Sequence, residues 1–343
     1  MHATNTQGRA PAAERPARLV EVAPAPRLSV VVPCYDEEAV LEALELRAVA
    51  ACELAAAGAY EIVLVNDGSR DRTGAIIAGM AARNGAIVGV DLARHYGHQI
   101  ALPAGLSFAR GERVLVVDAD LQDPPELLTE MMAAMDGGAD VVYGRRTARR
   151  AETRFKTGSA HVFYRVLGRL AEIDIPLDAG DFRLMSRRAV DALLAMPEQH
   201  RFIRGMIAWV GLTQVEIPYE RAPRHAGGTK YPLRRMLALA ADAVTGFSIA
   251  PLRIPFALAL LFLATALGLG IYGLSRHSAA EIASGGLGTL LMFLAFSAVQ
   301  LACLGVIGEY LGRTHMQVKN RPLFVVKEIF ARREPARGAP PKP

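Results

Sequence analysis

Three carboxylates follow a short apolar run near the middle of the sequence. Val114–Val117 predicts a buried strand, and Asp118, Asp120 and Asp123 come directly after it. Asp118 and Asp120 are two positions apart, so their side chains would share one face if strand geometry continues. Hard oxygen ligands of this kind bind Mg²⁺ or Mn²⁺ and leave positions open for substrate phosphates. For an isolated pair of aspartates at this spacing, the alternative interpretation is a solvated turn that is rich in Asp.

The elements predicted around this stretch bring further acids to the same edge of a sheet. Strands are also predicted at 28–33, 61–66, 86–91 and 141–143. Helical patterns separate them, which indicates an α/β fold with a mostly parallel sheet covered on both faces. Such sheets bind ligands beyond the carboxyl ends of their strands. Asp36 and Asp67 each follow a predicted strand, so we expect them near Asp118 and Asp120.

A further candidate acid lies within a basic stretch. Arginines are frequent between Arg145 and Arg188, which is typical of a solvated helix face or of contact with anionic head groups. Asp181 follows a glycine and has apolar neighbours, so partial burial is predicted. A buried carboxylate without a partner is costly, and Arg183 is the candidate partner.

The segment Glu220–Tyr231 is rich in glycine and in cations. Arg221, Arg224 and Lys230 could bind a phosphate through charge-assisted hydrogen bonds. Taken alone, the segment is equally well interpreted as a plain linker.

Two long uncharged runs mark the C-terminal third of the chain. The runs 254–275 and 282–308 each exceed the roughly 18–20 apolar residues that span a bilayer. A buried hairpin in a soluble core is the alternative, and two such runs in tandem disfavour it. Cations flank both runs, whereas Arg276 is the one lysine or arginine between them. The positive-inside rule then predicts both termini in the cytoplasm and residues 276–281 in the periplasm.

Composition agrees with a membrane-associated chain. Of the 343 residues 52% are hydrophobic, and the excess over a soluble domain lies after residue 250. A net charge of +5 suits a membrane surface or a phosphorylated substrate as well as nucleic acid. The three cysteines show no metal-like spacing and are predicted to be reduced. Residues 1–26 lack the apolar core of a signal peptide and predict a disordered tail.

Eight motifs occur in order along the chain. They are VVPCYDEE at 31–38, EIVLVNDGSRDRT at 61–73, GHQIALPAGLSFARG at 97–111, VLVVDADLQDPPE at 114–126, DVVYGRR at 140–146, GDFRLMSRRAV at 180–190, RFIRG at 201–205 and GGTKYPLRRM at 227–236. Over Leu28–Lys327 the chain resembles glycosyltransferase family 2. Within that family it is similar to the membrane-anchored polyprenyl-phosphate glycosyltransferases, the group of dolichyl-phosphate mannose synthase and the bactoprenol glucosyltransferases. Ordered motifs at family-like spacing are far more specific than any single motif.

The resemblance implies a fold and a set of site residues. The fold is GT-A, a nucleotide-binding α/β fold, with a C-terminal hairpin of two transmembrane helices. The implied metal ligands for Mg²⁺ or Mn²⁺ are Asp118, Asp120 and Gln122, and the implied catalytic acids are Asp181 and Asp120. Donor-binding residues are implied at Pro33, Tyr35, Asp36, Glu38, Asp67, Asp118, Arg145 and Arg146. Acceptor-phosphate residues are implied at Arg183, Arg221, Arg224 and Lys230.

Two positions depart from the family pattern. Asp36 stands where asparagine is usual, and Asn66 stands where many members have aspartate. The extra negative charge at Asp36 alters the contacts that this residue can make with a nucleotide. The Q-x-x-R-W motif of processive polysaccharide synthases does not occur in the sequence.

The resemblance also implies a domain layout. It runs as a tail at 1–26, a catalytic domain at 27–231, a juxtamembrane amphipathic segment at 232–253, two membrane helices at 254–308 and a cytoplasmic segment with a tail at 309–343.

The expected activity is the inverting transfer of a sugar, with UDP-glucose as the favoured donor, to undecaprenyl phosphate. It is expected at the cytoplasmic face of a bacterial inner membrane, in a multi-pass protein that has no nucleic-acid partner. The resemblance also implies a homo-oligomer, with a tetramer as the expected form. The alternatives are transfer from GDP-mannose or from a modified sugar, transfer to a growing polysaccharide, and a non-catalytic membrane scaffold that retains the fold.

Overall fold

An eight-stranded sheet forms the centre of the computed structural model, which describes residues 25–147, 179–220 and 286–331 and isolated residues between 252 and 271. The strand order is β7-β5-β6-β4-β1-β2-β3-β8. The strands are β1 Leu28–Cys34, β2 Tyr60–Asn66, β3 Ile87–Leu92, β4 Arg113–Val116, β5 Val141–Arg146, β6 Ala179–Ser186, β7 Gln214–Tyr219 and β8 Val326–Phe330. The neighbouring strands β4, β1, β2 and β3 run parallel, as do β5 and β7. This is the GT-A-like α/β arrangement, with a mostly parallel sheet, that the sequence predicts.

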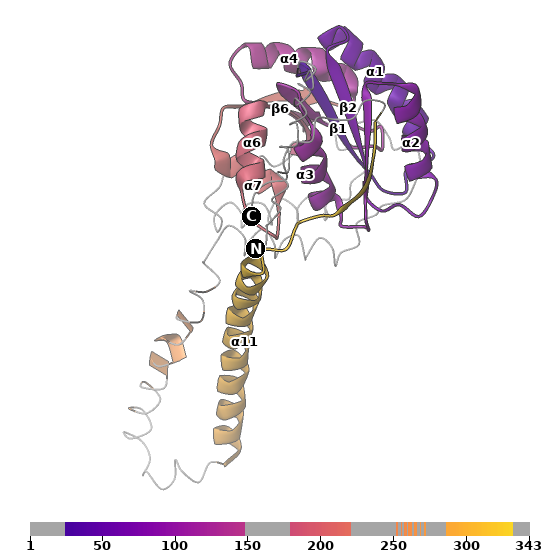
Figure 1. Ribbon diagram of the computed structural model, residues 1–343. Coiled ribbons are helices and arrows are strands. Elements are labelled where there is room, and N and C mark those ends of the chain that lie inside the picture. The colour runs from indigo at the N-terminus through magenta and orange to yellow at the C-terminus, as the bar shows by residue number, and fades with distance from the viewer. Residues whose placement is uncertain are drawn as a thin grey trace, which may run out of the picture.

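Helices cover both faces of the sheet (Figure 1). They are α1 Leu41–Ala56, α2 Thr73–Arg83, α3 His98–Phe108, the short 3-10 helix η1 Pro125–Leu127, α4 Leu128–Asp136, α6 Arg187–Ala195 and α7 Ile203–Val210. Val30 and Val32 belong to the core beneath α1, α2 and α4, whereas Val31 belongs to the core beneath α3, α6 and α7. Because both faces are buried, the strands are continuous apolar runs in the sequence.

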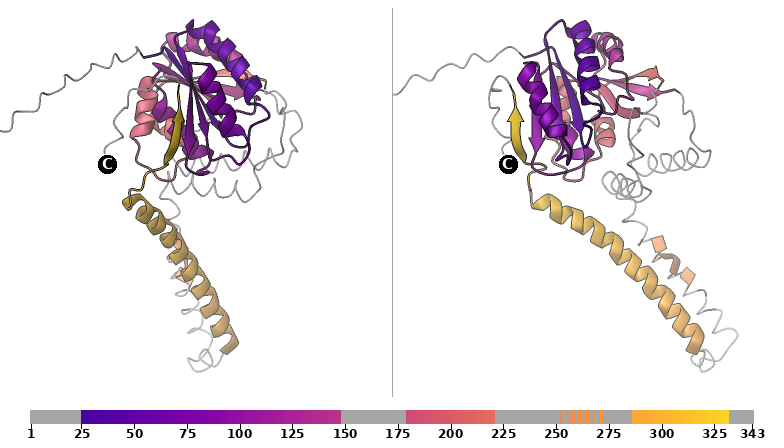
Figure 2. Two further views of the ribbon diagram at one scale, coloured as in Figure 1. Left: turned by 45° about the vertical axis from the view of Figure 1, so that its right-hand side comes forward. Right: turned by 90° about the vertical axis from the view of Figure 1, so that its right-hand side faces the viewer.

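The C-terminal segment supplies an unpredicted strand. β8 pairs antiparallel with β3 and forms one edge of the sheet, as both views of Figure 2 show. β6 is also antiparallel to its neighbours β4 and β5. The chain therefore returns to the α/β domain after residue 318, and β8 is structurally part of that domain.

The long helix α11, Gly286–Val318, extends away from the α/β domain (Figure 1). Several of its side chains are exposed: Met292, Phe293, Phe296, Leu301, Leu304, Ile307 and Leu311. Among the described residues, no helix combines the length and the apolarity needed to cross a membrane. α11 overlaps the second predicted span, and most of the first lies outside the described residues, so the two-helix hairpin stays a prediction. The predicted tail at 1–26 and the juxtamembrane segment at 232–253 also lie almost wholly outside the described residues.

Candidate functional site

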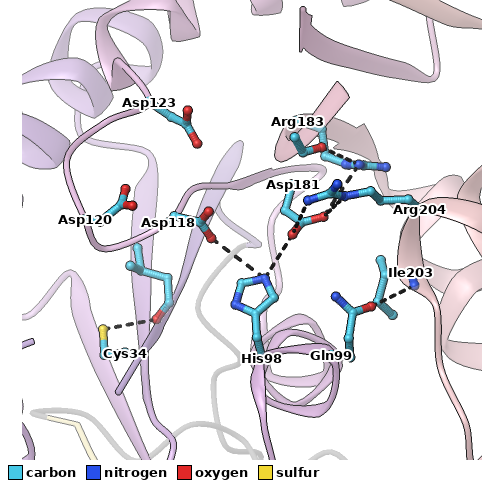
Figure 3. A network of polar contacts seen from close by, with 12 residues as sticks. Cys34, His98, Gln99, Asp118, Asp120, Asp123, Asp181, Arg183, Ile203 and Arg204 are labelled. Atoms are coloured by element: carbon cyan, nitrogen blue, oxygen red, sulfur yellow. Dashed lines mark hydrogen bonds and ion pairs between the residues drawn. The ribbon is translucent and has the colours of Figure 1, made fainter. Parts of the chain in front are cut away.

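The acidic stretch follows β4 as a loop. β4 ends at Val116, and the backbone turns at Leu121, whose φ is +58°. The amide of Gln122 donates to Oδ1 of Asp120 at 3.2 Å within this turn. Strand geometry therefore ends before Asp118, so the condition under which strand alternation would place Asp118 and Asp120 on one face is not met. The loop itself carries the acids, as Figure 3 shows.

His98 joins the acidic loop to Asp181 on β6 (Figure 3). Its Nε2 lies 3.2 Å from Oδ2 of Asp181 and 3.7 Å from Oδ1 of Asp118. The possible ligand atoms of these three residues all lie within 4.8 Å of one another. His98 is the first residue of α3, and Gly97 before it has a φ of +94°, a conformation that glycine adopts without a steric cost.

The environment of His98 favours its protonated form. Burial lowers the pKa of His98, but the hydrogen bond to Asp181 and the charges of Asp118 and Asp181 outweigh burial and raise it to about 9. At neutral pH the imidazole is therefore a cation that lies between two carboxylates.

Asp181 is buried and held by two cations. Arg204 of α7 donates from Nε to Oδ1 at 2.8 Å and from Nη2 to Oδ2 at 3.1 Å. Burial raises the pKa of Asp181, but the charge of Arg204 and the hydrogen bonds from His98 and Arg204 hold it well below its usual range. The predicted partner Arg183 lies farther away, at 3.9 Å, and donates to the backbone oxygen of Gly180 at 2.6 Å. Arg204 rather than Arg183 is thus the main partner of Asp181.

The acids of the loop suit a divalent cation. Burial raises the pKa of Asp118 and His98 lowers it, while the charges of Asp181, Asp123 and Asp120 raise it further, to about 6. Such a concentration of carboxylate oxygens and negative charge is the environment that a hard divalent cation requires. Among the described residues, the possible ligand atoms that converge are those of His98, Asp118 and Asp181, which is consistent with a divalent cation. Binding of Mg²⁺ or Mn²⁺ by Asp118, Asp120 and Gln122 stays a prediction.

Two predicted donor-binding residues lie directly beyond β1. The ring of Tyr35 packs against the ring of His95, with centroids 4.0 Å apart and an interplanar angle of 32°. Asp36 has a φ of +53°, and its Oδ1 accepts a hydrogen bond from the amide of Arg70 at 2.8 Å. The amide of Asp36 donates to Oγ of Ser69 at 3.0 Å. Asp36 thus ties the end of β1 to the turn that follows β2.

Pro33 and Glu38 have structural contacts. Pro33 is a buried residue of β1 and lies opposite Val65 of β2. The carboxylate of Glu38 accepts hydrogen bonds from the amide and from Nε of Arg72, at 3.0 and 3.2 Å. Their contact with a donor stays a prediction.

Asp67 uses both carboxylate oxygens to hold the loop before α3. Oδ1 accepts from the amide of Tyr96 at 2.7 Å, and Oδ2 accepts from the amide of Gly97 at 2.9 Å. Nδ1 of His95 also lies 2.9 Å from Oδ2. Asp67 therefore positions the residues that lead into His98, and its contact with a nucleotide stays a prediction.

Arg145 and Arg146 point to different partners. Nε of Arg145 lies 3.0 Å from Oε1 of Glu216 on β7. Nε of Arg146 donates to the hydroxyl of Tyr219 at 3.3 Å, and Nη2 of Arg146 lies 3.8 Å from Oδ1 of Asp123. The Tyr219 hydroxyl donates to the same Asp123 oxygen. Of the two arginines, Arg146 is thus the one directed to the acidic loop.

Among the predicted acceptor-phosphate residues, Arg183 lies within the described part of the chain. Burial lowers its pKa to about 10, which leaves the guanidinium charged at neutral pH. Arg221, Arg224 and Lys230 lie outside the described residues. His98, Arg204 and Tyr219 are parts of the site that the sequence analysis did not assign to it, although His98 and Arg204 lie within two of the ordered motifs.

Comparisons with known proteins identify the family of the chain. The profile of Glycosyl transferase family 2 matches residues 29–194. The chain is 40% identical to the glycosyltransferase YkcC of Bacillus subtilis, over 88% of this chain and 94% of the relative. It is 35% identical to the prophage bactoprenol glucosyl transferase homolog of Escherichia coli, over 88% of this chain and 99% of the relative. Among solved structures, the mannosyltransferase PcManGT of Pyrobaculum calidifontis, in complex with GDP-Man and Mn2+, has 19% identity and a TM-score of 0.42, over 85% of this chain and 90% of that one.

Proposed function

The chain belongs to glycosyl transferase family 2, and from this premise we propose that it transfers a sugar from a nucleotide-sugar donor to the phosphate of a polyprenyl phosphate, with inversion at the anomeric carbon. The observation that carries the proposal is the set of contacts around Asp181. These contacts suit a phosphate acceptor better than a hydroxyl acceptor.

A hydroxyl acceptor needs a general base within hydrogen-bond reach. Asp181 is the carboxylate at the expected position, but its oxygens already accept hydrogen bonds from Arg204 and His98. Its pKa is held well below the usual range, so it is a poor proton acceptor. The second pKa of a phosphate ester is about 6, so a phosphate acceptor is already mostly ionised at pH 7. Such an acceptor needs to be positioned, and it does not need to be deprotonated.

In the proposed reaction an acceptor phosphate oxygen forms a bond to the anomeric carbon while the bond from that carbon to the donor diphosphate breaks. When Mg²⁺ or Mn²⁺ is bound by Asp118, Asp120 and Gln122, it supplies positive charge to the leaving diphosphate. Asp181 stays ionised and offers negative charge to the anomeric centre as positive charge develops there. His98 and Arg204 fix the orientation of the Asp181 oxygens, so no reorganisation is needed at the moment of transfer.

The names of the relatives support the choice of substrates. The Escherichia coli relative is named as a bactoprenol glucosyl transferase homolog, and phage relatives at 33–34% identity are named bactoprenol glucosyl transferases. We therefore propose UDP-glucose as the donor and undecaprenyl phosphate as the acceptor. GDP-mannose and modified sugars are the competing donors.

We propose that the reaction takes place at the cytoplasmic face of a bacterial inner membrane. The uncharged runs 254–275 and 282–308, with their flanking cations, support this location. The exposed apolar side chains of α11 also support it. A Ser278→Cys variant should be labelled by a membrane-impermeant reagent in intact cells. Labelling of Thr314→Cys in place of Ser278→Cys would overturn this topology.

A donor screen tests the activity. Purified full-length protein would be incubated with undecaprenyl phosphate and, in separate reactions, with UDP-glucose, UDP-galactose and GDP-mannose. We expect a lipid-linked sugar from UDP-glucose that depends on added acceptor. Transfer from another donor would change the assignment of the sugar and leave the rest of the proposal intact. Failure to form a lipid-linked sugar from any nucleotide sugar would favour a scaffold and would overturn the proposal.

A further inference from the structure

The segment from the last turn of α11 to β8 contacts the loops that precede α7 and α3, the helices that carry Arg204 and His98. We define this segment, Gln317–Lys327, as the C-terminal strap. It begins in the last turn of α11 and ends in β8. We propose that the strap is a positioning element of the active site, which sets Arg204 and His98 against Asp181. Only the kinetic test of this inference rests on the proposed function.

One end of the strap is joined to the loop before α7. The side-chain amide of Gln317 donates from Nε2 to the backbone oxygen of Pro197 at 2.6 Å, and its Oε1 accepts from the amide of Gln199 at 2.9 Å. The side chain of Gln199 in turn donates to the backbone oxygen of Arg321 at 2.8 Å. These hydrogen bonds connect two segments that lie about 120 positions apart in the sequence. They fix the loop 197–202 immediately before Ile203 and Arg204.

The next contact reaches the site itself. The amide of Ile203 donates to Oε1 of Gln99 at 3.0 Å, and Gln99 is the neighbour of His98 (Figure 3). Arg204 directly follows Ile203 and holds Asp181 through two hydrogen bonds. The N-terminus of α7 is thus placed between the strap on one side and the residues beside His98 on the other.

The other end of the strap holds the loop before α3. The amide of Val325 donates to the hydroxyl of Tyr96 at 3.2 Å, and the backbone oxygen of Val325 accepts from the amide of Ala93 at 2.9 Å. Lys327 lies 3.1 Å from Asp91 at the end of β3. Tyr96 is two residues before His98, and its amide is held by Asp67. The strap and Asp67 therefore act on the same loop from two directions.

Ordinary packing of the C-terminus is the alternative. Phe324 and Val326 do pack against the core beneath α3, α6 and α7, so stability alone does not separate the two interpretations. The contacts of Gln317 distinguish the two interpretations. These contacts are polar, they join two specific backbone segments, and they lead through Gln199 to Arg204. A positioning role predicts coupling between Gln317 and Arg204, whereas a purely structural role predicts independent effects.

The test is a double-mutant cycle in the full-length protein. We expect Gln317→Ala to lower kcat about five- to tenfold while KM for the donor changes by less than about twofold. In an Arg204→Ala background, Gln317→Ala should lower kcat by no more than about twofold further. His315→Ala, which alters an exposed side chain in the same turn of α11, is the matched control and should retain full activity.

Hydrogen exchange provides a readout that needs no substrate. In Gln317→Ala the amides of residues 197–204 should exchange faster than in the parent protein. Tyr96→Phe, which keeps the ring beneath Arg94, should speed exchange at residues 94–99. Unchanged exchange in these segments, or a full additive loss of kcat in the double variant, would overturn the positioning role. Because exchange is measured without donor or acceptor, a wrong assignment of the substrates does not affect it.

Discussion

Arg204 and Asp181 form a two-point ion pair between α7 and β6, with distances of 2.8 and 3.1 Å. The planar guanidinium matches both oxygens of a carboxylate, which fixes the orientation of the carboxylate as well as its charge. His98 approaches Oδ2 of the same carboxylate at 3.2 Å. With two cations against it, Asp181 is a fixed negative charge at the site. The expectation that it acts by orienting or by electrostatic stabilisation follows from this pair.

Removing the Arg204 guanidinium should reduce catalysis. Losing charge-assisted hydrogen bonds to Asp181 should lower kcat of Arg204→Ala about ten- to hundredfold. Arg204→Lys restores the charge without the two-point geometry, so it should recover only part of the loss. The measurement is steady-state kcat and KM for donor and acceptor separately.

Arg201 offers a contrasting variant from the same motif. Within the described part of the chain its guanidinium donates to the backbone oxygens of Leu193, Met196 and Glu198, and none of these three hydrogen bonds involves Asp181. Arg201→Ala should therefore lower Tm, with a smaller effect on kcat per folded molecule. Full kcat in Arg204→Ala would contradict the role assigned to the ion pair.

The acidic loop leads to a second prediction, on metal dependence. Asp118→Asn and Asp120→Asn remove carboxylate oxygens from the proposed cation site, and each should abolish metal-dependent transfer while the far-UV spectrum is unchanged. EDTA should abolish transfer by the parent protein, and added Mg²⁺ or Mn²⁺ should restore it. Asp191→Asn, a change at an exposed acid on α6, is the matched control. Full activity in EDTA would refute the metal site.

The contact between Tyr219 and Asp123 leads to a third prediction, on stability. Asp123 is fully buried, and the Tyr219 hydroxyl donates to it. Tyr219→Phe keeps the ring but removes this donor beside a buried carboxylate, which should lower the free energy of unfolding by about 1–3 kcal/mol. Urea unfolding measures the change, and a loss of less than about 0.5 kcal/mol would show that the hydrogen bond contributes little.

Gly144 tests the packing of the same ring. A Cβ at Gly144 would lie 2.6 Å from Cε1 of Tyr219 and 2.8 Å from Cδ1 of Phe182, so Gly144→Ala should displace the ring and cost about 1–3 kcal/mol. A Cβ at Gly85 would have no neighbour within 4 Å, which makes Gly85→Ala the matched control. Equal stability of the two variants would contradict the packing argument.

The sequence predicts the α/β core well because burial on both faces leaves a local signal. Apolar runs of strand length end in polar turn residues, and helical patterns separate them, so β1 to β5 appear close to the predicted positions. β8 carries no such signal. Its five residues include Lys327 and Glu328, and it becomes a strand because the edge of β3 is available to it. The sequence of a short polar segment does not indicate that it will pair with a strand more than 200 residues away.

The sequence indicates candidate site residues where the chemistry is local, and not where it depends on contacts distant in sequence. Asp118 and Asp120 are prominent as acids after a predicted strand, and Asp181 as an acid with apolar neighbours. His98 lies 83 positions from Asp181, so its role depends on how α3 is placed beside β6. Arg201 and Arg204 look alike within the motif RFIRG, yet α7 begins at Ile203. Arg204 therefore reaches Asp181, while Arg201 binds the preceding loop.

The last prediction concerns the segment Arg221–Tyr231, which follows β7 in the sequence and lies outside the described residues. The backbone oxygen of Tyr219 accepts hydrogen bonds from the amide and the hydroxyl of Thr147, and its side chain reaches Asp123, so β7 ends at the edge of the acidic site. We expect Arg221, Arg224 and Lys230 to bind the acceptor phosphate. If these cations serve only to attach the domain to anionic lipid, at about 1 kcal/mol each, then Arg224→Ala should have little effect in neutral detergent.

Binding of the acceptor predicts a different result in the same detergent. Loss of a charge-assisted hydrogen bond should lower kcat/KM for polyprenyl phosphate about ten- to hundredfold in Arg221→Ala or Arg224→Ala. The KM for the donor should stay within about twofold, because the segment is assigned to the acceptor. Arg188, which pairs with Asp140 away from the acidic loop, provides a matched arginine control in Arg188→Ala. Unchanged kcat/KM for the acceptor in both variants of the segment would remove it from the acceptor site and leave lipid attachment as its role.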